Sequence, residues 1–235
     1  MGESTNNNWR DVLAHRVIDT RDNERKNWTK HSRNAGEYVD VLKGLQHFLE
    51  YIRSNVNEGN PDLVGDLGGG TTKAIAQLRD SEMGFGLRYE ATGLIRNREV
   101  NEYLGGKNFH LTTFERLSCF KPFSLGGAIS VFGEGYAANP ELAMEKLDEK
   151  LAPSAVFKAN FQHPDKMTPQ LTFIPHDRFS KKLRELGYDV AIVDNDACES
   201  QILVAIKQPT KIAAQKLLDL DLADYEEQKR MFVLK

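Results

Sequence analysis

Apolar residues recur along the chain with two different periods, and the order of those periods predicts alternating strands and helices. Short apolar or alternating runs, typical of strands, begin at Leu63 and then occupy residues 85–89, 108–112, 128–132, 155–161, 188–193 and 201–207. Apolar residues spaced three or four apart predict helices at 74–78, 95–103, 140–151 and 179–186. This alternation favours one α/β domain with a doubly wound, mostly parallel sheet.

The segment ahead of the first strand carries the longest amphipathic pattern. Apolar residues from Ala35 to Val56 are separated by alternating gaps of three and four, which predicts one continuous helix of about five or six turns. The chain then divides into an N-terminal helical extension (1–58), an α/β core (59–209) and a C-terminal helical tail (210–235).

Composition narrows the possible classes without naming a substrate. Hydrophobic residues make up 40% of the 235 residues, enough for one sizeable core. The 31 basic and 34 acidic residues give a net charge of −3, so a broad surface for nucleic acid is not indicated. Cys119 and Cys198 are too few for a metal site or a disulfide framework. No secretory or membrane segment is visible, so the expected location is the cytoplasm.

The first strand leads into a glycine turn, Asp66-Leu67-Gly68-Gly69-Gly70-Thr71-Thr72, and then into a helix. Glycines here allow positive φ and a close approach of a ligand to the backbone, and the amides that start the helix would face open space. Lys73 stands where the dinucleotide-binding fingerprint needs its last glycine, and no phosphate loop of the G-x-x-x-x-G-K-[ST] type occurs. The actin and Hsp70-like ATPases share Asp-Leu-Gly-Gly-Gly-Thr, but their turn joins two strands of a hairpin.

The turn resembles motif I of the class I S-adenosylmethionine-dependent methyltransferases, as Asp66-x-Gly68-x-Gly70-x-Thr72, with Thr72 where that family most often has a third glycine. The resemblance covers residues 61–209 and implies a Rossmann-like seven-stranded sheet, helices on both faces and an antiparallel last strand. It also implies that Asp66 binds the methionine end of S-adenosylmethionine, directly or through water, while the backbone of Gly68, Gly69 and Gly70 lies along its sugar and sulfonium. A cationic ligand is attracted by a carboxylate that would repel a pyrophosphate.

Other cofactor contacts are expected at the ends of the following strands. Glu90 follows Asp66 by 24 positions, after a helix-length gap, and is the predicted ribose ligand. The resemblance suggests that Thr113 and Phe114 contact the adenine. Phe132, at the end of the fourth strand, is a further candidate for cofactor binding. It also implies a lid from the N-terminal segment, in which Trp28 and His31 are the candidates.

Two loops at the carboxyl ends of strands are expected to receive the acceptor. The first carries Glu134, which can accept a proton, and Tyr136, which can stack on an acceptor. The second, residues 162–177, is long for its position and carries His163 and His176, which titrate near neutral pH and are candidate general bases. Alignment alone can contribute about 7 to 11 kcal/mol to a displacement, so such an enzyme need not have an obligatory base.

Three functions remain open from the sequence. The first is a methyltransferase acting at oxygen or nitrogen of a small or medium-sized acceptor. The second is an ATP-binding domain that uses the glycine turn for phosphate. The third is an inactive methyltransferase-like scaffold, to which residues 212–225 would add a partner surface.

Overall fold

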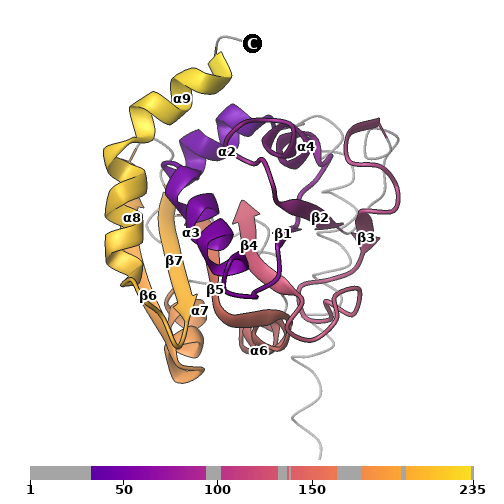
Figure 1. Cartoon of the computed structure of the whole chain (residues 1–235). Coiled ribbons are helices and arrows are strands. Elements are labelled where there is room, and N and C mark those ends of the chain that lie inside the picture. Colours follow the sequence, from indigo (N-terminus) through magenta and orange to yellow (C-terminus); the bar gives the residue numbers. More distant parts are fainter. Residues whose placement is uncertain are drawn as a thin grey trace, which may run out of the picture.

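The computed structural model describes residues 33–93, 102–131, 137, 139–162, 176–196 and 200–233. Its centre is a seven-stranded sheet in the order β3-β2-β1-β4-β5-β7-β6 (Figure 1). All strands run parallel except β7, which lies antiparallel between β5 and β6. The predicted Rossmann-like sheet with an antiparallel last strand is therefore confirmed. The strands are β1 (Leu63–Leu67), β2 (Arg88–Gly93), β3 (Phe109–Leu111), β4 (Leu125–Val131), β5 (Leu151–Gln162), β6 (Tyr188–Asn195) and β7 (Ser200–Lys207).

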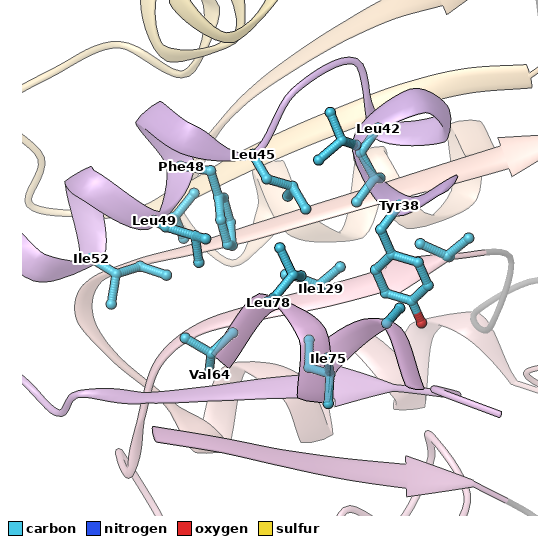
Figure 2. Close-up of a cluster of buried hydrophobic side chains, with 14 of the residues drawn as sticks. Tyr38, Leu42, Leu45, Phe48, Leu49, Ile52, Val64, Ile75, Leu78 and Ile129 are labelled. Carbon is cyan, nitrogen blue, oxygen red and sulfur yellow. The ribbon is translucent and has the colours of Figure 1, made fainter. Parts of the chain in front are cut away.

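Helices cover both faces of the sheet, and each face has its own hydrophobic core. On one face lie α2 (Ala35–Leu42), α3 (Gln46–Val56), α4 (Lys73–Arg79), α8 (Ala214–Ala223) and α9 (Tyr225–Val233). On the other lie α6 (Pro140–Lys150) and α7 (His176–Glu185). Figure 2 shows the first core, in which Tyr38, Phe48 and Leu78 from three helices meet Val64 and Ile129 from the sheet.

The single N-terminal helix predicted from the apolar period is wrong, because the chain breaks after Leu42. Lys43 and Gly44 adopt positive φ values of 50° and 98°, and α3 starts at Gln46. A Cβ on Gly44 would lie 2.7 Å from the backbone oxygen of Asp221, so glycine is needed for close contact with α8. The period runs through the break because α2 and α3 pack on the same face of the sheet.

The second strand was placed too early in the sequence. Residues 81–86 form the turn after α4, Phe85 is 78% exposed, and β2 runs from Arg88 to Gly93. Gly84 allows this turn, because a Cβ there would lie 2.0 Å from the oxygen of Leu78. Glu90 is therefore the third residue of β2 and does not close the strand.

The C-terminal helices are fastened to the core by a buried ion pair. The Nζ of Lys158, in β5, lies 2.6 Å from an oxygen of Asp221 and 2.9 Å from the oxygen of Gly44, and neither charged side chain is exposed. The other Asp221 oxygen accepts the amide of His47, and the Gln228 side chain accepts the amide of Leu45. The tail thus packs against the turn between α2 and α3, and the proposed boundaries at 58 and 209 stay predictions. No helix in the described part of the chain is both long and apolar enough to cross a membrane.

Candidate cofactor site

The glycine turn lies where the order of strands reverses. β1 pairs with β2 on one side and β4 on the other, so the turn after Leu67 opens at the switch point of the sheet. Gly68 and Gly70 have φ values of 84° and 56°, which favour glycine. Ligands of open α/β sheets bind in the crevice at this point.

Asp66 is completely buried beneath the turn and accepts hydrogen bonds from a tyrosine of α2. The Tyr38 hydroxyl lies 3.2 Å and 3.1 Å from the two carboxyl oxygens. A Cβ on Gly69 would meet one of those oxygens at 2.1 Å, so the middle glycine provides the space for this carboxyl group. Burial raises the pKa of Asp66 to about 7, although the Tyr38 hydrogen bond and the charge of Arg33 oppose that rise.

Arg33 brings a positive charge to the same edge. Its guanidinium donates to the backbone oxygen of Val131, the last residue of β4, at 3.5 Å. It is also close enough to Asp66 for its charge to favour the carboxylate. The charge of Arg33 therefore acts on Asp66 at the carboxyl ends of β1 and β4.

The amides of Gly68 and Gly69, ahead of the helix start, are directed toward the neighbouring strand β2. Gly68 and Gly69 both donate their amides to the backbone oxygen of Thr92, at 3.1 Å and 3.0 Å. The Thr92 hydroxyl lies 3.2 Å from the Gly68 nitrogen. Two amides that a phosphate loop would offer to its ligand are thus used to join the turn to β2.

Thr72 is strained and leaves a polar atom unsatisfied. It has a φ of 67° as the residue before α4, a conformation that costs a β-branched residue on the order of 1–3 kcal/mol. Its hydroxyl is buried and has no hydrogen-bond partner within the described residues. A strained residue with an orphaned hydroxyl beside the turn is a feature that commonly marks a binding site.

Glu90 and the predicted adenine residues have other contacts. The Glu90 carboxylate lies 2.8 Å from the Nε2 of His110, and both side chains are about one-quarter exposed. Phe114 is 8% exposed and packs edge-on against Phe157 in the core, which leaves little ring surface for an adenine. Thr113 uses its backbone oxygen to accept amides from the following turn. The ribose role of Glu90 and the adenine roles of Thr113 and Phe114 stay predictions.

The remaining candidates for the acceptor follow β4 and β5 in the sequence. β4 ends at Val131 and β5 at Gln162, directly before the two predicted acceptor loops, and α7 begins at His176. The side chain of His176 lies outside the described part. The other candidates outside the described residues are Trp28, His31, Phe132, Glu134, Tyr136 and His163.

Sequence reasoning missed the role of Tyr38. Its position in the apolar stripe of the predicted helix indicated a core residue, and its ring is indeed buried. Its hydroxyl, however, donates a hydrogen bond to the Asp66 carboxyl group. No sequence signal marks this contact, because the two residues are 28 positions apart and on different elements. His110, the partner of Glu90, was missed for the same reason.

No protein-family model and no curated protein matches this sequence. Among solved structures, the chain is similar to a Burkholderia thailandensis 1,6-didemethyltoxoflavin-N1-methyltransferase with bound 1,6-didemethyltoxoflavin and S-adenosylhomocysteine. The TM-score is 0.54 at 17% identity, over 88% of this chain and 92% of that one. Two weaker matches are S-adenosylmethionine-dependent methyltransferases. The one from Archaeoglobus fulgidus has a TM-score of 0.49 at 14% identity, over 68% of this chain and 93% of that one. The one from Aquifex aeolicus has a TM-score of 0.46 at 15% identity, over 74% of this chain and 99% of that one. The chain has the fold of the class I S-adenosylmethionine-dependent methyltransferases.

Proposed function

We propose that this protein is an S-adenosylmethionine-dependent methyltransferase that binds its cofactor at the glycine turn. The observation that carries the proposal is the buried carboxyl group of Asp66 beneath Gly69, at the switch point of the sheet. A cation bound above the turn would interact with Asp66 across the glycine or through the Tyr38 hydroxyl. Two unit charges about 5 Å apart attract by ~3 kcal/mol at an effective dielectric constant of about 20.

The residues present fit a cationic cofactor better than a phosphate. The ionisable group beneath the turn is the carboxyl group of Asp66, which a bound cation favours in its ionised form, and the amides of Gly68 and Gly69 already bind Thr92. The turn also leads into α4 and not into a hairpin. These contacts argue against the ATP-binding alternative. The orphaned hydroxyl of Thr72 is a further group that a ligand in this place can satisfy.

The cofactor supplies a methyl group on a good leaving group, so the main task of the protein is alignment. The first acceptor loop leads from the end of β4 to α6, and the second leads from the end of β5 to α7, so both follow the carboxyl ends of strands next to the glycine turn in the sheet or beyond it. We assign Glu134, Tyr136, His163 and His176 to the acceptor side, as binding residues or as a base for an oxygen or nitrogen nucleophile. A small or medium-sized acceptor is supported by the Burkholderia neighbour, which was crystallised with 1,6-didemethyltoxoflavin.

Calorimetric titration with S-adenosylmethionine, S-adenosylhomocysteine and ATP tests the proposal. We expect the first two to bind and ATP not to bind. Asp66→Asn should weaken S-adenosylmethionine binding by ~1–3 kcal/mol, the range for a lost interaction with a charged group. Asp62→Asn is the matched control, because Asp62 precedes the same strand and pairs with Arg88 on the surface. Binding of ATP alone, or equal losses in the two variants, would reject the cofactor assignment.

Turnover requires a separate assay, because a scaffold protein with this fold can retain cofactor affinity. Release of S-adenosylhomocysteine from S-adenosylmethionine is measured against a panel of small hydroxyl and amine acceptors. An active enzyme gives acceptor-dependent release. Tight cofactor binding without release for any acceptor would favour the inactive scaffold.

A further inference from the structure

A pocket lies at the amino ends of β4 and β5, whereas the glycine turn follows the carboxyl end of β1. Its volume is about 650 Å³, and its walls come from the loop before β4 and from the last turn of α6. Both segments lead directly into the amino ends of strands, β4 at Leu125 and β5 at Leu151. In Figure 1, α6 lies at the end of β4 away from its arrowhead. The pocket is thus separate from the proposed cofactor site.

Positive side chains predominate in this pocket. Its lining includes the cations of Arg116, Lys121, Lys146 and Lys150, against the carboxylates of Glu115 and Glu149. Phe120 and Pro122 add apolar surface. Burial raises the pKa of the Cys119 thiol to about 11, so this lining residue carries no negative charge at neutral pH. The surroundings therefore favour an anion with an apolar part.

Lys150 is the unusual member of the set. It is 8% exposed, and among the described residues its ammonium has one charged neighbour, a Glu149 oxygen at 3.8 Å. That distance is too long for a hydrogen bond. The other Glu149 oxygen is 2.5 Å from the Nζ of Lys146, so this carboxylate is shared. The side chain of Lys150 is thus mostly covered, and its ammonium at the pocket wall has no close partner among the described residues, which leaves it available to a ligand.

Among the described residues, the last carbonyl groups of α6 are not hydrogen-bonded to Lys150. A cation near a helix C-terminus is stabilised by the free carbonyl groups there. In α6, however, the carbonyl of Asp148 accepts from Lys207 at 2.7 Å, and that of Glu149 accepts from the amide of Phe123 at 3.1 Å. Both of these groups are already satisfied by other donors.

We propose that this pocket binds an organic phosphate, with Lys150, Lys121 and Arg116 on the phosphate and Phe120 against the organic part. The volume of this pocket lies within the range of about 300–1,000 Å³ that is usual for small-ligand sites. It is larger than a bare phosphate needs, so the ligand is expected to carry an organic part. The excess of positive charge favours a dianion over a neutral molecule. The proposal does not depend on the cofactor assignment, since no residue is shared with the glycine turn.

Phenyl phosphate is a suitable probe because it combines a dianion with an aromatic ring and does not resemble the cofactor. Binding to the full-length protein is followed by the ³¹P NMR linewidth and by calorimetry in low salt. Inorganic phosphate and phenol are the comparisons. We expect phenyl phosphate to bind at least five times more tightly than inorganic phosphate, phenol not to bind, and the affinity to fall as salt is added.

Variants locate the site. Lys150→Met should weaken phenyl phosphate binding at least tenfold, and Lys121→Gln several-fold. Lys121 is exposed, so its replacement tests the site even if Lys150→Met does not fold. Lys211→Met, which removes an exposed lysine paired with Glu58, is the charge-matched control and should bind like the wild type. S-adenosylhomocysteine affinity should be the same in all three variants.

Failure of the proposal is distinct from failure of the cofactor assignment. No binding of phenyl phosphate by the wild type at millimolar concentration would overturn the proposal. Equal affinities in the Lys121→Gln and Lys211→Met proteins would also overturn it, because the binding would then lie elsewhere.

Discussion

The protonation state of Asp66 should control cofactor affinity near neutral pH. Burial raises its pKa to about 7, so the unliganded carboxyl group is half protonated at that pH. A bound cation favours the ionised form, and binding at lower pH must therefore release a proton. For a pKa of about 7, roughly 9% of the protein is ionised at pH 6 and about 91% at pH 8. A ligand that binds the ionised form should lose about tenfold in affinity between pH 8 and pH 6, or ~1.4 kcal/mol.

Calorimetry in two buffers with different ionisation enthalpies measures both the affinity and the protons released. We expect nearly one proton released per S-adenosylmethionine bound at pH 6 and few at pH 8. The amino group of the ligand itself titrates at about 7.7–8.0. The same titrations of Asp66→Asn therefore provide the correction, because that variant retains the ligand's contribution and lacks that of residue 66. An identical pH dependence in wild type and Asp66→Asn would show that this carboxyl group does not interact with the cofactor.

Three further predictions concern stability, measured by urea unfolding, and the first also concerns ligand affinity, measured by calorimetry. Gly69→Ala should destabilise the protein and weaken S-adenosylhomocysteine binding at least tenfold, because its Cβ would overlap the Asp66 carboxyl group; wild-type affinity would contradict this. Thr72→Gly should stabilise the fold by ~1 kcal/mol by relieving positive-φ strain, and a loss of stability would show that the methyl group contributes more than the strain costs. Lys158→Met should cost ~3–5 kcal/mol by leaving the carboxylate of Asp221 buried alone. The double variant Lys158→Met/Asp221→Leu should recover much of that loss, and no recovery would mean that the hydrogen bonds outweigh the charge effect.

The order of strands and helices along the chain was predictable because it depends on local patterns. The alternation of Ala155 to Phe161, the apolar spacing of Phe179 and Leu183 and the cap at Gly187 each specify an element without distant information. The seven-stranded sheet and its antiparallel last strand were expected from the resemblance and not from local patterns.

The errors arose where distant residues decide local structure. The break at Gly44 depends on contact with Asp221, 177 residues away in sequence, and the apolar period is the same on both sides of it. The start of β2 depends on how closely the turn at Gly84 approaches Leu78. Neither of these close contacts changes the spacing of apolar residues in the sequence.

The candidate site was predicted in part for a similar reason. Glycines and an acid at the end of a strand predict a ligand-binding turn, and Asp66 does lie under Gly69. The Tyr38 hydroxyl, the bonds from Gly68 and Gly69 to Thr92 and the pair formed by Glu90 and His110 all join separate elements. Contacts of this kind form only when the sheet has folded, so the sequence pattern does not reveal them.

Binding of S-adenosylmethionine at the glycine turn is tested most directly by a crystal structure of the complex with S-adenosylhomocysteine. We expect density for the ligand over Gly68 to Gly70, with its amino-acid end toward Asp66 and Tyr38. Density at any other place on the protein, with the turn unchanged and empty, would contradict the cofactor assignment.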